Sequence, residues 1–362
     1  MLRKSDKFLH LAFLAIFAFF IPLAYTTGLL SINSISLWGR YFCFAIAALG
    51  IDLIWGYTGI MSMCQAIFFC FGGYGIGMYL TLQTGSGPAW LPDFMSWNNL
   101  TELPFFWTGF QHFIPAIVLA ILFSAAVAYI IGYFIFRSRI KGVYMAIITQ
   151  ALALSVYLLF IRNETNMGGT NGLTNFKSLL GFDLAAPAVK LSLYMVSLFA
   201  LVGIYQICRF IVSSKFGKVL LAIRDSEARV GYTAYRVLHY KLSIFVIAAI
   251  IGTLAGILYV PQTGIITPGR MDVKSSVEML MWVALGGRGH LKGAILGALS
   301  VNCLYSLCTT FFPEGWLFIL GMLYVLTVLY FDKGFLGLLE KLTASLGIKR
   351  KKVSITPSNQ QI

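Results

Sequence analysis

The chain has 362 residues, of which 59% are hydrophobic and 11% are Asp, Glu, Lys or Arg. A water-soluble domain needs more polar surface than this composition supplies, and the mean hydropathy of +0.82 is typical of a membrane protein. The net charge of +14 does not indicate a nucleic-acid partner, because the basic residues lie in short clusters between apolar runs.

Ten apolar runs predict an all-α, polytopic membrane protein, since a transmembrane β-barrel would need short alternating segments instead. In chain order the runs cover roughly residues 8–29, 36–55, 58–82, 111–136, 143–161, 189–212, 240–261, 275–287, 291–312 and 315–331. The eighth run would reach only ~20 Å as a helix, less than the ~30 Å hydrocarbon core. We expect it to be a broken helix or to begin before residue 275.

The distribution of Lys and Arg orients these runs. With both termini in the cytoplasm, 21 of the 27 Lys and Arg residues lie on the cytoplasmic side, which agrees with the positive-inside rule. Arg270 and Lys274 are then assigned to an external loop. The same rule favours a full crossing by the eighth run. We divide the chain into a transmembrane domain, residues 1–335, and a cytoplasmic amphipathic segment with a disordered tail, residues 336–362.

Known catalytic and ligand-binding patterns are absent from the sequence. The stretch "GGRGHLKG" (286–293) has glycines and a lysine but lacks the Walker A spacing that holds a phosphate. There is no HExxH, no GxSxG and no CxxC pair, and the six cysteines all lie in apolar segments. We therefore expect no enzyme active site, no metal and no cofactor.

A few polar residues and a glycine cluster lie inside the predicted membrane segments. Polar groups at membrane depth either line a solute pathway or join neighbouring helices by hydrogen bonds. Closely spaced glycines permit either close helix packing or local unwinding beside a pathway. The candidate pathway residues are Gln65, Gly72, Gly73, Gln150, Glu278 and Asn302.

The stretch "SKFGKVLLAIRDSEAR" (214–229) is unusually charged for this chain. Its apolar residues Phe216, Val219, Leu220 and Ile223 share one helical face, which predicts an amphipathic helix within about 214–235. Such a helix could rest on anionic lipid. Acidic residues mixed with the basic ones favour a protein partner. The candidate contact residues are Lys218, Arg224, Asp225, Glu227 and Arg229.

"AIRDSEARVGYTAYRVLHYKL" and the following "FVIAAIIGTLAGILYVPQTGIITP" resemble the coupling region and next helix of ATP-binding cassette importer permeases of the branched-chain amino-acid family. "WGYTGIMSMCQAIFFCFGGYGIGMYL", "FRSRIKGVYMAIITQALA", "RNETNMGGTNGLTNFK", "VALGGRGHLKGAILGA" and "PEGWLFILG" are similar to the urea branch of that family. The resemblance covers nearly the whole chain. Cys64-Gln65-Ala66 departs from the pattern, where glycine is common.

The resemblance implies a multi-pass permease of the bacterial inner membrane that moves urea or a short-chain amide inward. Its implied partners are a second, homologous permease, two cytoplasmic ATPases and a periplasmic solute-binding protein, besides membrane lipid. The five charged residues of 214–229 would then couple the permease to ATP hydrolysis. Two alternatives remain: a branched-chain amino-acid importer of the same design, and a partner-independent channel or secondary transporter.

Overall fold

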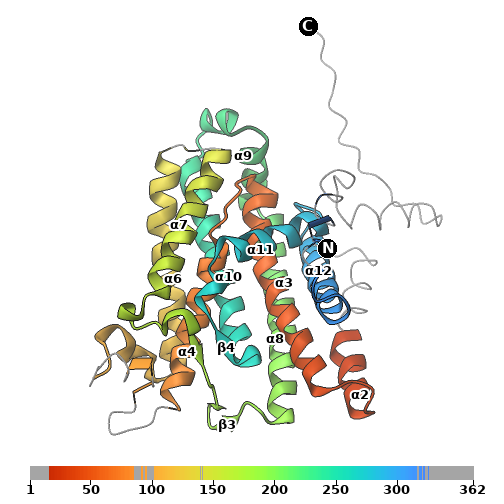
Figure 1. Ribbon diagram of the computed structural model, residues 1–362. Helices are drawn as coiled ribbons and strands as arrows, with labels where there is room; N and C mark the ends of the chain where they lie inside the picture. Colours follow the sequence, from red (N-terminus) through yellow and green to blue (C-terminus); the bar gives the residue numbers. More distant parts are fainter. Residues whose placement is uncertain are drawn as a thin grey trace, which may run out of the picture.

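The fold is described from a computed structural model (Figure 1), which covers residues 16–84, 91–92, 94–95, 102–138, 140, 142–315, 318–319, 321–322 and 325. Within these residues, seven helices are long and apolar enough to cross a membrane. They are α3 (Ile32–Thr58), α4 (Gln65–Leu82), α6 (Phe113–Arg137), α7 (Val143–Ile161), α8 (Pro187–Ser213), α10 (Val237–Thr263) and α12 (Leu291–Phe311). The all-α, polytopic class is therefore confirmed.

Short elements connect these helices. The helical ones are η1 (Ile16–Phe20), α2 (Ile21–Thr26), η2 (Phe105–Gln111), η3 (Asn163–Thr165), η4 (Gly169–Asn171), α9 (Lys215–Gly231), η5 (Pro268–Arg270) and α11 (Val273–Gly286). Strand β1 (Leu173–Thr174) pairs antiparallel with β4 (Ile265–Ile266), and β2 (Ser178–Leu179) with β3 (Phe182–Asp183). In Figure 1, α9 lies at one end of the bundle and β3 at the other.

The predicted count of about ten crossings is not confirmed. The first and tenth runs lie partly outside the described residues, and the segment 336–362 lies wholly outside them. The third run is helical only from residue 65 rather than 58. Helix α3 extends to Thr58, and Gly59 then ends it in a left-handed conformation (φ 74°), which glycine adopts without a steric penalty.

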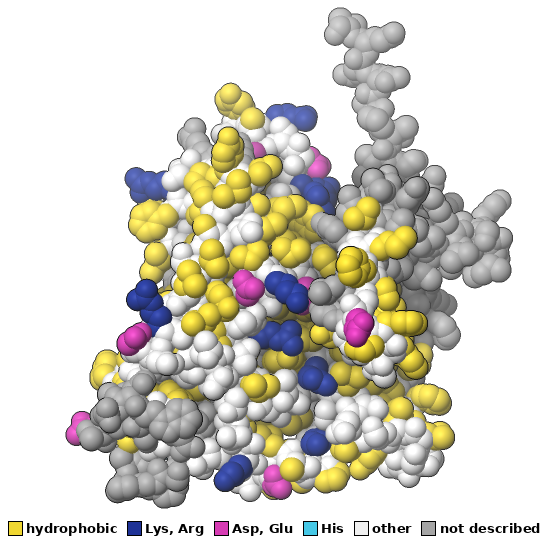
Figure 2. Space-filling model, viewed as in Figure 1, with side chains coloured by type: hydrophobic (Ala, Val, Ile, Leu, Met, Phe, Trp, Pro, Cys, Tyr) yellow, Lys and Arg dark blue, Asp and Glu magenta, His cyan; other side chains and the backbone are white. Residues whose placement is uncertain are grey.

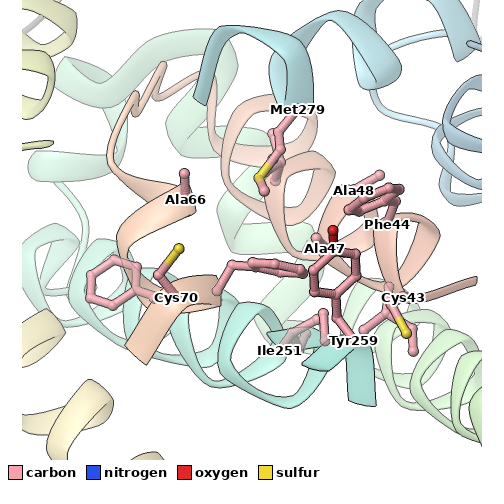
Figure 3. Packing of buried hydrophobic residues seen from close by; sticks show 14 of the residues in the cluster. Cys43, Phe44, Ala47, Ala48, Ala66, Cys70, Ile251, Tyr259 and Met279 are labelled. Atoms are coloured by element: carbon pink, nitrogen blue, oxygen red, sulfur yellow. The ribbon is translucent and has the colours of Figure 1, made fainter. Parts of the chain in front are cut away.

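Helices α3, α4 and α10 form the centre of the bundle, and α4 is almost wholly buried. Glycines bring α4 and α10 together: a Cβ added at Gly72 would lie 2.0 Å from the Thr253 carbonyl oxygen, and one at Gly256 would lie 1.8 Å from that of Phe69. The glycine cluster in α4 thus serves close packing within an unbroken helix. Figure 3 shows Met279 of α11 reaching into the same interior as Tyr259 of α10.

The outer helices present apolar side chains to their surroundings. Phe134 of α6 and Phe199 of α8 are 66% and 61% exposed, as expected of residues that face lipid. Figure 2 shows such hydrophobic side chains spread over the visible surface. Helices α6 and α8 therefore have apolar outer faces, whereas α3 and α4 are largely buried.

The eighth run is the short helix α11, which begins at Val273, two residues before the predicted start, and follows an extended segment. Helix α10 ends at the left-handed Gly264, and β4 then packs Ile266 against Gly73 and Gly77, midway along α4. Helix α11 starts only after η5, and its 14 residues span ~21 Å. Its end packs against α12, because Gly286 lies in backbone contact range of Gly293. An extended segment, η5 and the short helix α11 thus connect α10 to α12, and residues 264–286 are called the interrupted segment below (Figure 1).

Candidate functional site

The predicted amphipathic helix at about 214–235 is α9, which lies across the end of the bundle (Figure 1). The Ser214 hydroxyl caps its first turn by accepting a hydrogen bond from the Gly217 N–H at 3.4 Å. Its residues Leu220 and Ile223, on the predicted apolar face, are buried. The backbone leaves the helical conformation at Ser226, so the last turn of α9 changes direction.

Arg224 joins α9 to the membrane helices. Its guanidinium donates a hydrogen bond of 2.9 Å to the carbonyl oxygen of Gly56, in the last turn of α3. The Nε of Arg224 also donates to Asp225 at 3.2 Å. Carbonyl groups in the last turn of a helix lack intrahelical donors and carry partial negative charge, so a cation there is stabilising.

The same end of α3 binds the turn between α11 and α12. Asp52 is fully buried, and its Oδ1 accepts a 2.7 Å hydrogen bond from the N–H of Gly289. A Cβ at Gly56 would lie 2.2 Å from that carboxylate and 2.6 Å from the Gly289 nitrogen, so only glycine fits. Arg288 places its guanidinium 5.2 Å from the centre of the Trp55 ring. The α11–α12 turn and α9 therefore both attach to the end of α3.

A second link runs from α9 to α10. Lys241 is 9% exposed, and its Nζ donates to Glu227 Oε1 at 2.6 Å. The ring of Phe216 in α9 also stacks on that of Tyr240 in α10, with centroids 5.3 Å apart. Helix α9 is therefore attached to both α3 and α10.

The five candidate coupling residues fall into two groups. Arg224 and Glu227 bind other parts of the chain, as described above. Lys218, Asp225 and Arg229 are exposed on the surface of α9. The first pair attaches α9 to α3 and α10. In the second group, Asp225 is also paired with Arg224 on the surface of α9.

Replacing Glu227 with Gln is expected to lower the free energy of unfolding by about 1–3 kcal/mol, because the buried Lys241 loses its carboxylate. The exchange Glu227→Lys with Lys241→Glu should recover part of that loss. Thermal unfolding of the purified protein measures both variants. Glu164→Gln, at an exposed position, serves as the control, and an equal effect there would contradict the role of the ion pair.

Comparison with known proteins identifies the family. Residues 33–328 match the permease component of the branched-chain amino acid transport system. The chain belongs to this family. It is thus a membrane permease of the ATP-binding cassette importer type, as the resemblance implied.

Several named permeases are similar to this one. The probable branched-chain amino acid transport permease protein LivM of Methanocaldococcus jannaschii is 26% identical over 90% of this chain and 98% of its own length. The high-affinity permease protein LivM of Escherichia coli is 24% identical over 81% of this chain and 67% of its own. The ribose import permease protein RbsC of the same species is 21% identical over 52% of this chain and 59% of its own length. No solved structure matches this permease.

The candidate pathway residues are spread over four helices of this permease. Gly72 and Gly73 lie at the packed faces of α4, and Gln65 is buried at its start. Asn302 donates to the Ala298 carbonyl oxygen of its own helix at 2.8 Å. The other two candidate pathway residues, Gln150 on α7 and Glu278 on α11, are half-buried.

Sequence reasoning missed the Asp52–Gly289 bond and the position of Arg270. The stretch "GGRGHLKG" was compared with phosphate-binding patterns, whereas its glycines fit the turn against Asp52 and Gly56. Arg270, which the charge pattern places in an external loop, lies with its guanidinium 5.8 Å from the ring centre of Phe44, midway along α3.

Proposed function

We propose that this permease forms the membrane pathway of an ATP-driven importer for urea or a short-chain amide. The observation that carries the proposal is where the motifs similar to the urea branch meet. "WGYTG" (55–59) packs on "GGRG" (286–289) at one end of α11. "NMGGTNG" (166–172) packs on the segment before α11, where a Cβ at Gly172 would lie 2.0 Å from the Ile266 carbonyl oxygen. These motifs thus contact both ends of the interrupted segment.

Two cytoplasmic ATPases would act on this pathway through α9. Lys218, Asp225 and Arg229 would contact the ATPase surface, and Arg224 and Glu227 would pass the movement to α3 and α10. A second permease of the same family would complete the pathway, and a periplasmic solute-binding protein would deliver the solute. In this arrangement the permease lies in the bacterial inner membrane with both termini in the cytoplasm, and hydrolyses no ATP itself.

Branched-chain amino acids are the second candidate solute. The names of the LivM proteins from Methanocaldococcus jannaschii and Escherichia coli favour them. The ribose permease is 21% identical over 52% of this chain. Permeases named for different solutes thus share sequence similarity with this chain. The solute must therefore be measured.

Accumulation of labelled urea at micromolar concentration is expected to depend on this chain. The assay uses urease-negative cells with and without the chain, in the presence of its partner subunits, so that urea is not consumed after entry. A large excess of leucine should leave urea uptake unchanged. Competition by leucine, or leucine uptake without urea uptake, would assign the permease to amino acids. Uptake that persists after ATP depletion would indicate a channel instead.

A further inference from the structure

Arg270 is a cation at the middle of the bundle. It ends η5, at the break between the extended segment and α11. Its guanidinium lies 5.8 Å from the ring centre of Phe44 and 5.6 Å from that of Tyr259. Phe44 is midway along α3, so Arg270 lies far from either end of that helix. A cation at membrane depth is costly, and one in such a place usually serves a solute pathway.

The rings that Arg270 contacts belong to one aromatic cluster. The Phe44 ring centre lies 5.2 Å from that of Tyr259 and 4.9 Å from that of Trp282. Tyr259 and Phe69 are likewise 5.2 Å apart. Aromatic faces attract the guanidinium electrostatically and leave its planar set of N–H donors for hydrogen bonds to oxygen. The cluster therefore holds Arg270 in place without using all its donors.

Glu278 provides the opposite charge. It is half-buried on α11, the helix that follows Arg270, and lies one helical turn beyond Lys274. Both acidic and basic side chains gather in the middle of the face shown in Figure 2, over the region that α11 crosses in Figure 1. The surrounding helices are apolar, so these charges form a polar site at the interrupted segment.

We propose that Arg270 and Glu278 are the two ends of a solute-binding site midway along the pathway. Arg270 donates to the solute's oxygen, and Glu278 accepts from its N–H groups. This inference rests on the proposed function and assigns the site to urea, whose carbonyl oxygen and two amino groups match these partners. The aromatic cluster below Arg270 would keep the site dry, which strengthens each hydrogen bond.

The chemistry of the two groups separates urea from an amino acid. A glutamine at position 278 still offers an acceptor oxygen to a neutral N–H, so urea binding should fall only in part. An ammonium group needs the negative charge, so an amino acid should lose as much with Glu278→Gln as with Glu278→Leu. A smaller loss of uptake in Glu278→Gln than in Glu278→Leu therefore indicates urea, and equal losses indicate an amino acid.

The test measures initial uptake of labelled urea and of labelled acetamide, which has a methyl group in place of one amino group. Arg270→Gln and Glu278→Leu should each lower urea uptake at low concentration about 10- to 100-fold, the effect of losing a hydrogen bond to a charged group. Glu278→Leu should lower acetamide uptake less than urea uptake. Arg270→Lys, which keeps the charge, should retain more uptake than Arg270→Gln.

Arg162→Gln and Glu164→Gln, at exposed positions beyond α7, are the matched controls, and membrane abundance is measured for every variant. Urea uptake within about twofold of these controls would overturn the site. An equal loss of urea and acetamide uptake in Glu278→Leu would also overturn it, because it would indicate a structural defect. Leucine uptake without urea uptake by the wild-type chain would contradict the proposed solute. In that case, equal losses of leucine uptake in Glu278→Gln and Glu278→Leu would support the same site as one for amino acids.

Discussion

Alanine in place of Gly72 or Gly256 is expected to destabilise the permease by about 1–3 kcal/mol each, and to reduce its amount in the membrane. The added methyl groups would lie 2.0 Å from the Thr253 carbonyl oxygen and 1.8 Å from that of Phe69. Both obstacles are helix backbone, which cannot move aside as the tip of a flexible side chain does. Helices α4 and α10 would have to separate, and the packing of the central layer would be lost.

Thermal unfolding of detergent-purified protein and immunoblots of the membrane fraction measure this effect. Gly203→Ala in α8 is the matched control, because a Cβ there has nothing within 4 Å. We expect this control to be neutral or slightly stabilising, since alanine favours a helix over glycine. If Gly72→Ala and Gly256→Ala unfold at the temperature of the control, the close approach of α4 and α10 is wrong.

Arg224→Ala is expected to lower ATP-driven uptake about 10- to 100-fold, through the loss of a charged hydrogen bond between α9 and α3. Its guanidinium reaches the Gly56 carbonyl oxygen at 2.9 Å, beside the point where Asp52 holds Gly289. Without this bond, a force on α9 would no longer reach the end of α3 or the α11–α12 turn. The permease should still insert, because Arg224 lies at the surface of the bundle.

Uptake in reconstituted vesicles with the partner ATPases, at equal permease content, measures the loss. Arg236→Ala, at an exposed position after α9, provides the matched control and should transport normally. Arg224→Lys should recover part of the uptake, since a lysine donates to a carbonyl but lacks the planar fork of arginine. Uptake by Arg224→Ala equal to that of the control would show that this bond plays no part in coupling.

The placement of several helices could be predicted from sequence because hydrophobicity is a local property. The run 143–161 coincides with α7, and those at 189–212 and 240–261 lie within α8 and α10. The amphipathic helix could likewise be predicted, because Leu220 and Ile223 recur at helical spacing and are buried as expected. The short eighth run predicted either a broken helix or an earlier start, because thirteen helical residues are too few to cross.

What the sequence determined by itself is the membrane class, the position of several long apolar helices and the surface helix that carries charge. The tertiary structure decided which charges of α9 face inward, why α4 needs glycine, and where Arg270 lies. These depend on contacts between distant segments: Arg224 and Gly56 are 168 residues apart, and Asp52 and Gly289 are 237 apart. A buried polar group takes the partner that packing brings within hydrogen-bond range, and no local pattern of residues specifies that partner.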